Sequence, residues 1–249
     1  MTIKHPLFVG AAVAGIVALA ATVASPVQAQ DYNWSGVYAG AHVGYGWSDV
    51  AARDVLPPNG GFFTPLGPAA GQGFTFDLDG VIGGAQVGIQ HQWGNIVLGA
   101  EISTSSGKLS KTSASPYFTS DIETGKINSL FLATARLGYA HNNWLIYVKG
   151  GYASADVEFQ AYDRVANSGY GQTKRQDGFA IGGGIEYGLT KNITLGLEYM
   201  KIDFGSETGN GLRSNGSPEM YKTDAEMQTV TARINFLIGR EPDRAAPLK

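Results

Sequence analysis

The chain has 249 residues, of which 35 are glycine and none is cysteine, and its formal net charge is −3. The lack of cysteine excludes a disulfide framework and thiolate metal sites, and the small negative charge argues against nucleic acid as a partner. Mean hydropathy is −0.07. This value leaves room for a membrane β-barrel, because the strands of such a barrel are short and only half apolar.

Residues 1–29 are predicted to form a cleaved signal peptide. Lys4 gives a basic start, an apolar stretch of mostly alanine and valine follows, and Val27-Gln28-Ala29 fits the small-x-small cleavage rule. The alternative is a retained transmembrane helix, which is disfavoured because the stretch is weakly hydrophobic and a cleavage site follows it. The mature chain is therefore expected to begin at Gln30.

Eight later segments alternate apolar side chains with glycine or polar ones. In the first, Val37, Val43 and Tyr45 share one parity, whereas Gly40 and Gly44 share the other. A period of two indicates a strand, because successive side chains of a strand point to opposite faces. The predicted strands lie near 35–48, 79–92, 95–105, 126–141, 144–157, 178–189, 192–204 and 226–239.

The connections between these segments alternate strictly between long and short. The short ones are tight turns that contain Gly or Asn, at 93–95, 141–143 and 190–192. The long ones are rich in Gly, Ser, Thr, Asn, Asp and Pro, at 49–78, 106–125, 158–177 and 205–225. Short periplasmic turns and longer extracellular loops are typical of a bacterial outer-membrane barrel. The sequence thus predicts an all-β protein, an eight-stranded antiparallel transmembrane up-and-down β-barrel over 30–239, followed by a short polar periplasmic tail at 240–249.

Each predicted strand has one face without charges through its middle. On the fourth strand this face runs through Ile127, Ser129 and Phe131. Charges of mid-strand take the opposite parity, namely Glu101, Arg136, Lys149, Glu186, Glu198 and Arg233. These three acids and three bases are expected to pair as a structural network in the lumen, because unpaired buried charges are costly. An ion path is the functional alternative, disfavoured because side chains fill the interior of an eight-stranded barrel.

Parity alone does not decide which face is outside, because a soluble lipocalin-like barrel has an apolar interior and a polar outer surface. Two features favour lipid outside. The charged face is rich in glycine, which suits a crowded interior, and aromatic residues gather near strand ends, as an interfacial girdle requires. The predicted girdle comprises Tyr45 and Trp47 at the loop end and Trp93, Tyr139, Trp144, Tyr187 and Phe236 at the turn end.

Several motifs resemble, in order, those of the small alphaproteobacterial outer-membrane immunogenic or porin-family proteins. The run of tryptophan, glycine and aromatic residues over 34–47 is similar to the opening of their mature chains. Ala135-Arg136-Leu137-Gly138-Tyr139-Ala140, the run over 145–153, Gly182-Gly183-Gly184-Ile185-Glu186-Tyr187 and Leu197-Glu198-Tyr199 resemble their fourth to seventh strands. Such chains usually end on an aromatic residue of the last strand, whereas here the tail follows Phe236 and Gly239.

The resemblance implies an OmpA-like barrel that is abundant at the surface of a Gram-negative bacterium. It implies roles in envelope integrity, host contact and antigenicity, with haem binding in some relatives, and it offers no catalytic residues. The expected partners are the lipid bilayer and lipopolysaccharide, the barrel-assembly machinery, and a host or surface partner reached through the long loops.

Little in the sequence points to other chemistry. His42, His91 and His141 lie on different strands without metal-ligand spacing, so no metal site is expected. Tyrosine can ligate haem iron, and the candidates are the loop residues Tyr117, Tyr162, Tyr170 and Tyr221. No cofactor and no catalytic residue are predicted. A structural and surface-interaction barrel is favoured over a narrow porin-like or haem-binding transport protein, and over a hydrolase with its site in the loops.

Overall fold

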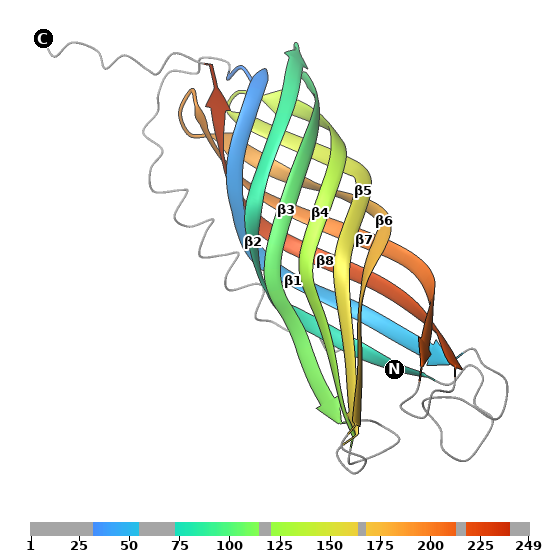
Figure 1. Cartoon of the computed structure of the whole chain (residues 1–249). Helices are drawn as coiled ribbons and strands as arrows, with labels where there is room; N and C mark the ends of the chain where they lie inside the picture. The colour runs from blue at the N-terminus through green and yellow to red at the C-terminus, as the bar shows by residue number, and fades with distance from the viewer. Residues whose placement is uncertain (1–31, 55–72, 115–120, 164–167, 213–217, 240–249) are drawn as a thin grey trace, which may run out of the picture.

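The computed structural model describes residues 32–54, 73–114, 121–163, 168–212 and 218–239, and these form a closed antiparallel barrel in which β1 pairs with β8 (Figure 1). The predicted fold class is confirmed. The predicted signal peptide and tail lie outside the described residues. The strands are β1 (Gly36–Asp54), β2 (Gly73–Trp93), β3 (Ile96–Ala114), β4 (Asp121–His141), β5 (Trp144–Asp163), β6 (Ser168–Gly188), β7 (Ile193–Leu212) and β8 (Pro218–Ile238).

The tight turns lie where the sequence predicts them. β2 and β3 are joined at Gly94 and β4 and β5 at Asn142, and both residues take left-handed backbone angles, with φ of 58° and 51°. Glycine adopts this region freely and asparagine more readily than most residues. These two-residue connections fix the register of their hairpins.

The predicted long loops are wrong in extent. β3 continues to Ala114 and β5 to Asp163, while β6 already begins at Ser168. Most of 106–125, 158–177 and 205–225 is therefore strand, and the strands leave only 55–72, 115–120, 164–167 and 213–217 between them at this end. Serine and threonine in these stretches suggest loops, but on β3 Ser106, Ser110 and Thr112 stand on the outward face of the strand.

The barrel wall is continuous only in the half that carries the tight turns, here called the turn half. Pairing of β2 with β3 ends at Ile82 and Gly107, and pairing of β6 with β7 ends at Phe179 and Asp203. Beyond these pairs the strands continue as two four-stranded sheets, β2-β1-β8-β7 and β3-β4-β5-β6, which form the loop half. The two sheets diverge toward the end opposite the tight turns in Figure 1.

The two halves have opposite interiors. The loop half holds one apolar cluster to which both sheets contribute, with Leu109 and Ile127 from one sheet and Leu78 and Phe204 from the other. The interior of the turn half is polar and charged, and its buried members include Gln86, Gln90, Glu101, Thr134, Arg136, Lys149, Glu186, Thr194, Glu198, Thr231, Arg233 and Asn235.

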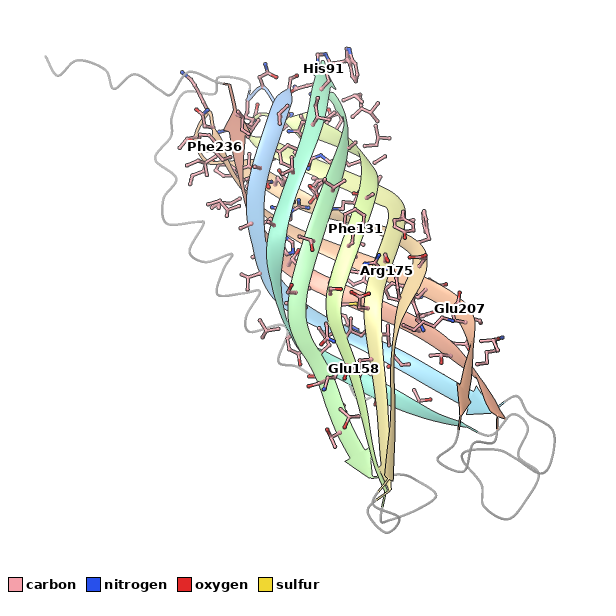
Figure 2. The ribbon with its side chains drawn as sticks, in the orientation of Figure 1. His91, Phe131, Glu158, Arg175, Glu207 and Phe236 are labelled. Carbon is pink, nitrogen blue, oxygen red and sulfur yellow. The ribbon has the colours of Figure 1, made fainter. Side chains whose placement is uncertain are left out.

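The outward faces reverse at the same level. In the turn half they are apolar, and on β4 this stretch runs from Tyr139 to Phe131. In the loop half the outward faces are polar. Figure 2 shows the contrast: Glu158 and Glu207 lie in the loop half, whereas Phe131 and Phe236 lie on the apolar band. A strand tilted in a bilayer needs about 9–11 residues to cross the hydrocarbon core, which matches the apolar stretch. Within the described ranges, no helix is long and apolar enough to cross a membrane.

The sequence prediction was wrong for Ile127, which is only 2% exposed and belongs to the apolar interior. The register between β4 and β5 shifts between Ile127 and Ser129, which leaves Asn128 as an extra residue on β4. A bulge of this kind inserts an extra residue and exchanges the faces of the strand beyond it. The uncharged face of β4 therefore stops at Phe131, because parity cannot be followed through the bulge.

Candidate functional site: the ion network of the lumen and the two rims of the apolar band

The structure brings all six predicted lumen charges together inside the turn half. They come from six consecutive strands, β3 to β8, and every one of them is buried. Each stands on the strand face opposite the outward apolar side chains, because that face alternates with them at a period of two.

Four of these charges form one cluster. Lys149 Nζ lies 2.8 Å from Glu101 Oε1 and 3.0 Å from Glu198 Oε2. Arg233 also bridges the same two carboxylates, through Nη2 to Glu101 and Nη1 to Glu198. Each acid thus faces two bases, which is the arrangement that compensates the cost of burying charge.

The remaining pair is Arg136 and Glu186, with Nη1 at 2.9 Å from Oε1. Arg136 also donates to Gln90 Oε1. Its guanidinium carbon lies 5.1 Å from the ring centroid of Tyr38 and 5.0 Å from that of Tyr147, within the range of cation–π attraction. Arg136 therefore links the pair to the four-charge cluster through two aromatic rings.

Two tyrosines of this network, Tyr38 and Tyr147, were missed by the sequence prediction. Tyr38 donates to Glu101 Oε2 at 2.7 Å, and Tyr147 donates to Glu198 Oε2 at 2.7 Å. Both lie on the inward faces of their strands, which otherwise carry glycine and charged residues. A large aromatic residue on such a face is the sequence signal that could have identified these two tyrosines.

Glycines make room for these rings. A Cβ built on Gly88 would lie 2.3 Å from Cζ of Tyr38, and one on Gly184 would lie 2.6 Å from the Tyr147 hydroxyl. Both distances are shorter than real side chains tolerate. Glycine at these two positions thus leaves the space that the two rings fill, whereas a Cβ on Gly44 or Gly84 would first meet the backbone oxygen of a neighbouring strand.

His42 lies on the loop-half side of the network. It forms hydrogen bonds through Nδ1 with Gln86 at 2.7 Å and through Nε2 with Ser105 at 2.8 Å. Neither His91 nor His141 lies near it, since both are exposed in the strand ends at the tight turns. Among the described residues, no group of three or more histidine and carboxylate side chains could hold a metal ion.

A second apolar cluster closes the turn end of the lumen. Trp34 is fully buried there with Leu145 and Val97, and its ring centroid lies 4.6 Å from that of Tyr32. The backbone N–H of Trp34 donates to Gln92 Oε1 at 2.7 Å and fixes the segment before β1. Side chains therefore occupy the lumen at three levels: this cluster, the ion network and the apolar interior of the loop half.

The predicted girdle residues lie at the two rims of the outward apolar band. Trp93, Tyr139, Trp144 and Phe236 are exposed at the turn rim, where Tyr187 packs 4.7 Å from Trp144 between ring centroids. Tyr45 is exposed at the opposite rim, and Trp47 is half-buried beside it. The sequence prediction missed further aromatic residues of that second rim, namely Phe131, Tyr152, Phe179 and Tyr199.

Three tyrosines of this second rim repeat one geometry. Tyr45 donates to Asp79, Tyr152 to Asp177 at 2.6 Å and Tyr199 to Gln228 at 2.7 Å. In each case the acceptor lies on the neighbouring strand, two positions beyond the residue paired with the tyrosine. A ring in the apolar band with its hydroxyl on the first polar row is the arrangement found at membrane interfaces.

The wall opens at this same rim in two places, between β2 and β3 and between β6 and β7. Backbone groups in hydrocarbon must all be paired within the protein, because no water is present to satisfy them. The pairing of β2 with β3 and of β6 with β7 is complete along the apolar band and ends where the outward faces turn polar. Backbone pairing and side-chain polarity thus mark one boundary.

Residues 15–229 match the family described as "Outer membrane protein beta-barrel domain". The chain belongs to this family. It is 30% identical over 193 residues to the 31 kDa outer-membrane immunogenic protein of Brucella melitensis, a match that covers 74% of this chain and 76% of that protein. It is 27% identical over 189 residues to the 25 kDa outer-membrane immunogenic protein of Brucella ovis, covering 74% and 77%.

Among solved structures, the outer membrane protein OprG of Pseudomonas aeruginosa is similar with a TM-score of 0.46 and 12% identity, covering 83% of this chain and 98% of that one. The family match and the curated relatives confirm the predicted family and the location of this barrel in the outer membrane. Because barrels of the outer membrane keep their short turns in the periplasm, the loop half extends from the outer leaflet to the cell exterior.

Proposed function

We propose that this outer-membrane barrel is closed to ions and serves as a structural element of the envelope that presents its loop half for surface interactions. The observation that carries the proposal is the filled lumen, in which Arg136 is clamped between Tyr38 and Tyr147 above Trp34. The apolar interior of the loop half supports it further, because a water-filled path for ions needs a polar wall throughout.

The refolded barrel is expected to give no unitary conductance in a planar bilayer, because conducting ions would have to displace buried ion pairs. The measurement is a single-channel recording at neutral pH and moderate salt, with a known porin as positive control. Discrete conductance steps would contradict the closed-barrel proposal and favour the porin-like alternative.

The haem-binding alternative rests on Tyr117, Tyr162, Tyr170 and Tyr221. The side chains of these four residues are not among those that the structure describes. We propose that the barrel carries no cofactor and is not an enzyme. A shift of the Soret band on titration of the refolded barrel with hemin would overturn the first statement.

Surface interaction is expected to depend on the connections of the loop half and not on the barrel wall. Deletion of 58–69, between β1 and β2, should abolish binding of antibodies or host partners that recognise this connection. The folded barrel migrates faster on an SDS gel when the sample is not boiled. The deletion should leave this heat-modifiable band unchanged, because the pairing of β1 with β2 closes the wall without the deleted residues. Boiled and unboiled samples on an SDS gel, beside whole-cell binding, make the measurement. Loss of the folded band would contradict a dispensable surface connection.

A further inference from the structure

Beyond the rim of the apolar band, the two sheets of the loop half end in edge strands. On one side the edges belong to β2 and β3, whose pairing ends at Ile82 and Gly107, and on the other side to β6 and β7. An edge strand in water is a template to which another strand can be added. Proteins obstruct such edges with bulges or with charged side chains, so each edge shows whether it can accept a strand.

Two of the four edges are bent by bulges. The register of β3 against β4 shifts between Ser106 and Leu109. The register of β7 against β8 shifts between Asp203 and Ser206, and Gly205 at this point has a left-handed φ of 63°. A bulge increases the local twist and interrupts the regular row of backbone groups, so neither edge offers a straight template.

The edge of β6 is obstructed by a lysine. The side chain of Lys174 reaches from β6 to β7, where its Nζ lies 2.9 Å from Glu207 Oε2 and 3.4 Å from the carbonyl oxygen of Thr208. This side chain spans the space between the two strands. A strand added along β6 would have to displace it.

The edge of β2 from Gly73 to Val81, here called the β2 edge, differs from the other three. Its register against β1 is regular along the whole stretch. Leu78 is buried in the apolar cluster of the loop half and holds the strand in place, whereas Thr75, Asp77 and Asp79 are exposed on the outward face. Within the described residues, the β2 edge is therefore straight, supported from inside and open to water.

The direction of the backbone groups follows from one hydrogen bond. The N–H of Ala140 on β4 donates to the carbonyl oxygen of Asn95 at 2.7 Å. Because backbone hydrogen bonds of an antiparallel strand alternate between its two neighbours, even-numbered residues of β3 pair with odd-numbered residues of β2. The N–H and C=O groups of Thr75, Asp77 and Asp79 therefore point to the open side. Their even-numbered neighbours bond to β1.

The outward face beside the β2 edge is acidic. Asp77 lies directly opposite Asp49 on β1, Asp49 opposite Glu226 on β8, and Glu226 opposite Asp203 on β7. Like charges in directly opposite positions of a sheet repel one another. Lys201 offsets part of this repulsion through its contact with Glu226 at 3.0 Å. A strand added to β2 would extend the row by one position, where a cation is favoured.

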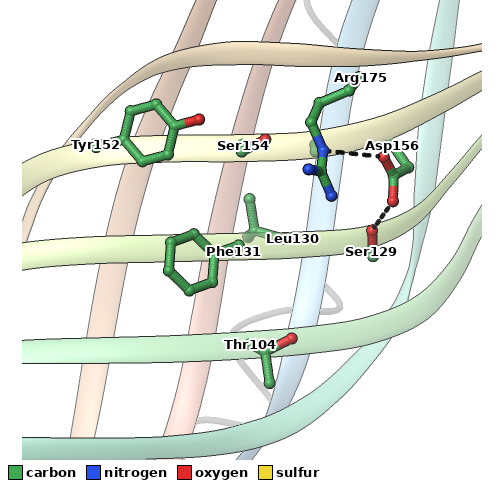
Figure 3. Close-up of a pocket in the computed structure, with 9 residues that line it drawn as sticks. Thr104, Ser129, Leu130, Phe131, Tyr152, Ser154, Asp156 and Arg175 are labelled. Atoms are coloured by element: carbon green, nitrogen blue, oxygen red, sulfur yellow. Dashed lines mark hydrogen bonds and ion pairs between the residues drawn. The ribbon is translucent and has the colours of Figure 1, made fainter.

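The other sheet shows no such row at the corresponding level of β4 to β6. There Arg175 Nε lies 3.5 Å from Asp156 Oδ1, and the hydroxyl of Ser129 donates to the same carboxylate at 2.6 Å (Figure 3). Charges of both signs thus meet across neighbouring strands of that sheet. The need for an additional cation is specific to the sheet that contains β2.

We propose that the β2 edge binds an extended cationic segment of another protein, which adds to the sheet as a strand antiparallel to β2. Its backbone pairs with Thr75, Asp77 and Asp79, and a lysine or arginine stands opposite Asp77. The site lies outside the connections to which the proposed function assigns antibodies and host partners, and the inference goes beyond that function.

A second copy of this chain fits the β2 edge poorly. Barrels in one membrane share their orientation, so β2 and β6 of a neighbouring copy would run parallel to this β2. Pairing of two β2 edges would also bring the aspartates of one copy against those of the other, which is unfavourable. The antiparallel candidates of a neighbouring copy, β3 and β7, carry the bulges.

The first test measures binding of a fluorescein-labelled peptide, in which lysine alternates with threonine, to the refolded barrel in neutral detergent by fluorescence anisotropy. Thr75→Pro removes an N–H that points to the open side and is expected to weaken binding roughly tenfold. Proline is tolerated there because the lost N–H does not bond to β1. The control Thr75→Val keeps the N–H and should bind as wild type does. Equal binding by Thr75→Pro would overturn the proposal.

The second test changes the peptide and leaves the barrel unaltered. In the proposed strand the lysines stand outward and are also the residues that pair with β2, so a peptide N-methylated at its lysines keeps the charge and loses the backbone donors. It is expected to bind at least tenfold more weakly to wild type. Equal binding would mean that charge alone attracts the peptide, and the proposal would fail.

The cationic preference is tested on Asp77. Asp77→Asn is expected to weaken binding of the lysine peptide roughly two- to fivefold, as loss of one exposed cross-strand charge pair does. A peptide with glutamate in place of lysine should bind far more weakly than the lysine peptide. Equal binding of the two peptides would refute a cationic partner. The unboiled gel band verifies that each variant is folded.

Amide hydrogen exchange followed by NMR locates the contact. Addition of the lysine peptide should slow the exchange of Thr75, Asp77 and Asp79, whose N–H groups are open in the free barrel. If these amides are already protected without peptide, to an extent that rises with protein concentration, a second copy occupies the edge and the proposal fails. Single-channel recording and deletion of 58–69 test the proposed function separately, so either proposal can fail alone.

Discussion

Replacing Lys149 with methionine should lower the free energy of unfolding by about 3–5 kcal/mol, as expected when one partner of a buried ion pair is removed. Lys149 contacts Glu101 and Glu198 at 2.8 and 3.0 Å in a site that water does not reach. Its loss leaves two carboxylates to share the single cation Arg233. Urea titration of the barrel refolded in lipid vesicles, followed by the heat-modifiable band, gives the measurement.

The matched control is Lys201→Met, which breaks an exposed pair of similar length, 3.0 Å to Glu226, on the outward face of β7 near the rim of the apolar band. Its expected effect is below about 1 kcal/mol because water screens that pair. The double variant Lys149→Met with Glu101→Gln should recover part of the loss, since it removes one of the unbalanced charges. If Lys149→Met and Lys201→Met lowered the free energy of unfolding equally, water would have to penetrate the lumen. That result would contradict the closed-barrel proposal.

The level of the ion network could be predicted from the sequence because one rule holds there. From Tyr139 to Ala133 on β4, the outward residues are apolar, and the inward residues are Gly138, Arg136 and Thr134. Parity then places Arg136 and its counterparts inside without any knowledge of contacts. It does not say which acid meets which base, since that depends on the tilt and stagger of strands that are distant in sequence.

The loop half was missed because its rule is the reverse. Its outward faces carry residues such as Ser110 and Asp177, while Leu78 and Leu109 point inward. A scan for an uncharged outward face therefore ends at the rim, and the remaining polar stretches suggest loops. The bulge at Ile127 removes the parity that would have carried the strand through.

This reversal has a physical cause. In hydrocarbon the outer surface must be apolar, and the narrow interior can then hold polar groups only if they pair. Beyond the rim the outer surface meets water, and the two sheets are held together by apolar contacts as in a soluble sandwich. Tyr45, Tyr152 and Tyr199 mark the change, each with its ring below the rim and its hydroxyl on the first polar row.

Gly88→Ala is expected to destabilise the barrel by about 1–3 kcal/mol, the usual cost of overpacking, although it adds one methyl group. The new Cβ would lie 2.3 Å from Cζ and 2.4 Å from the hydroxyl of Tyr38. The ring would have to move, and that movement would withdraw its hydrogen bond from Glu101 and its face from Arg136. One methyl group would thus disturb both parts of the ion network.

The control for this variant lies on the same strand. A Cβ on Gly83 would meet nothing closer than the backbone oxygen of His42 at 3.5 Å, an ordinary contact, so Gly83→Ala should be neutral within about 0.5 kcal/mol. Urea titration of both variants in vesicles separates the two explanations of the glycines in β2. If glycine is there only for the flexibility of the strand, the variants will behave alike. If glycine makes room for Tyr38, only Gly88→Ala will lose stability. The same variant will then also lose the contacts of Tyr38 with the charges that close the lumen.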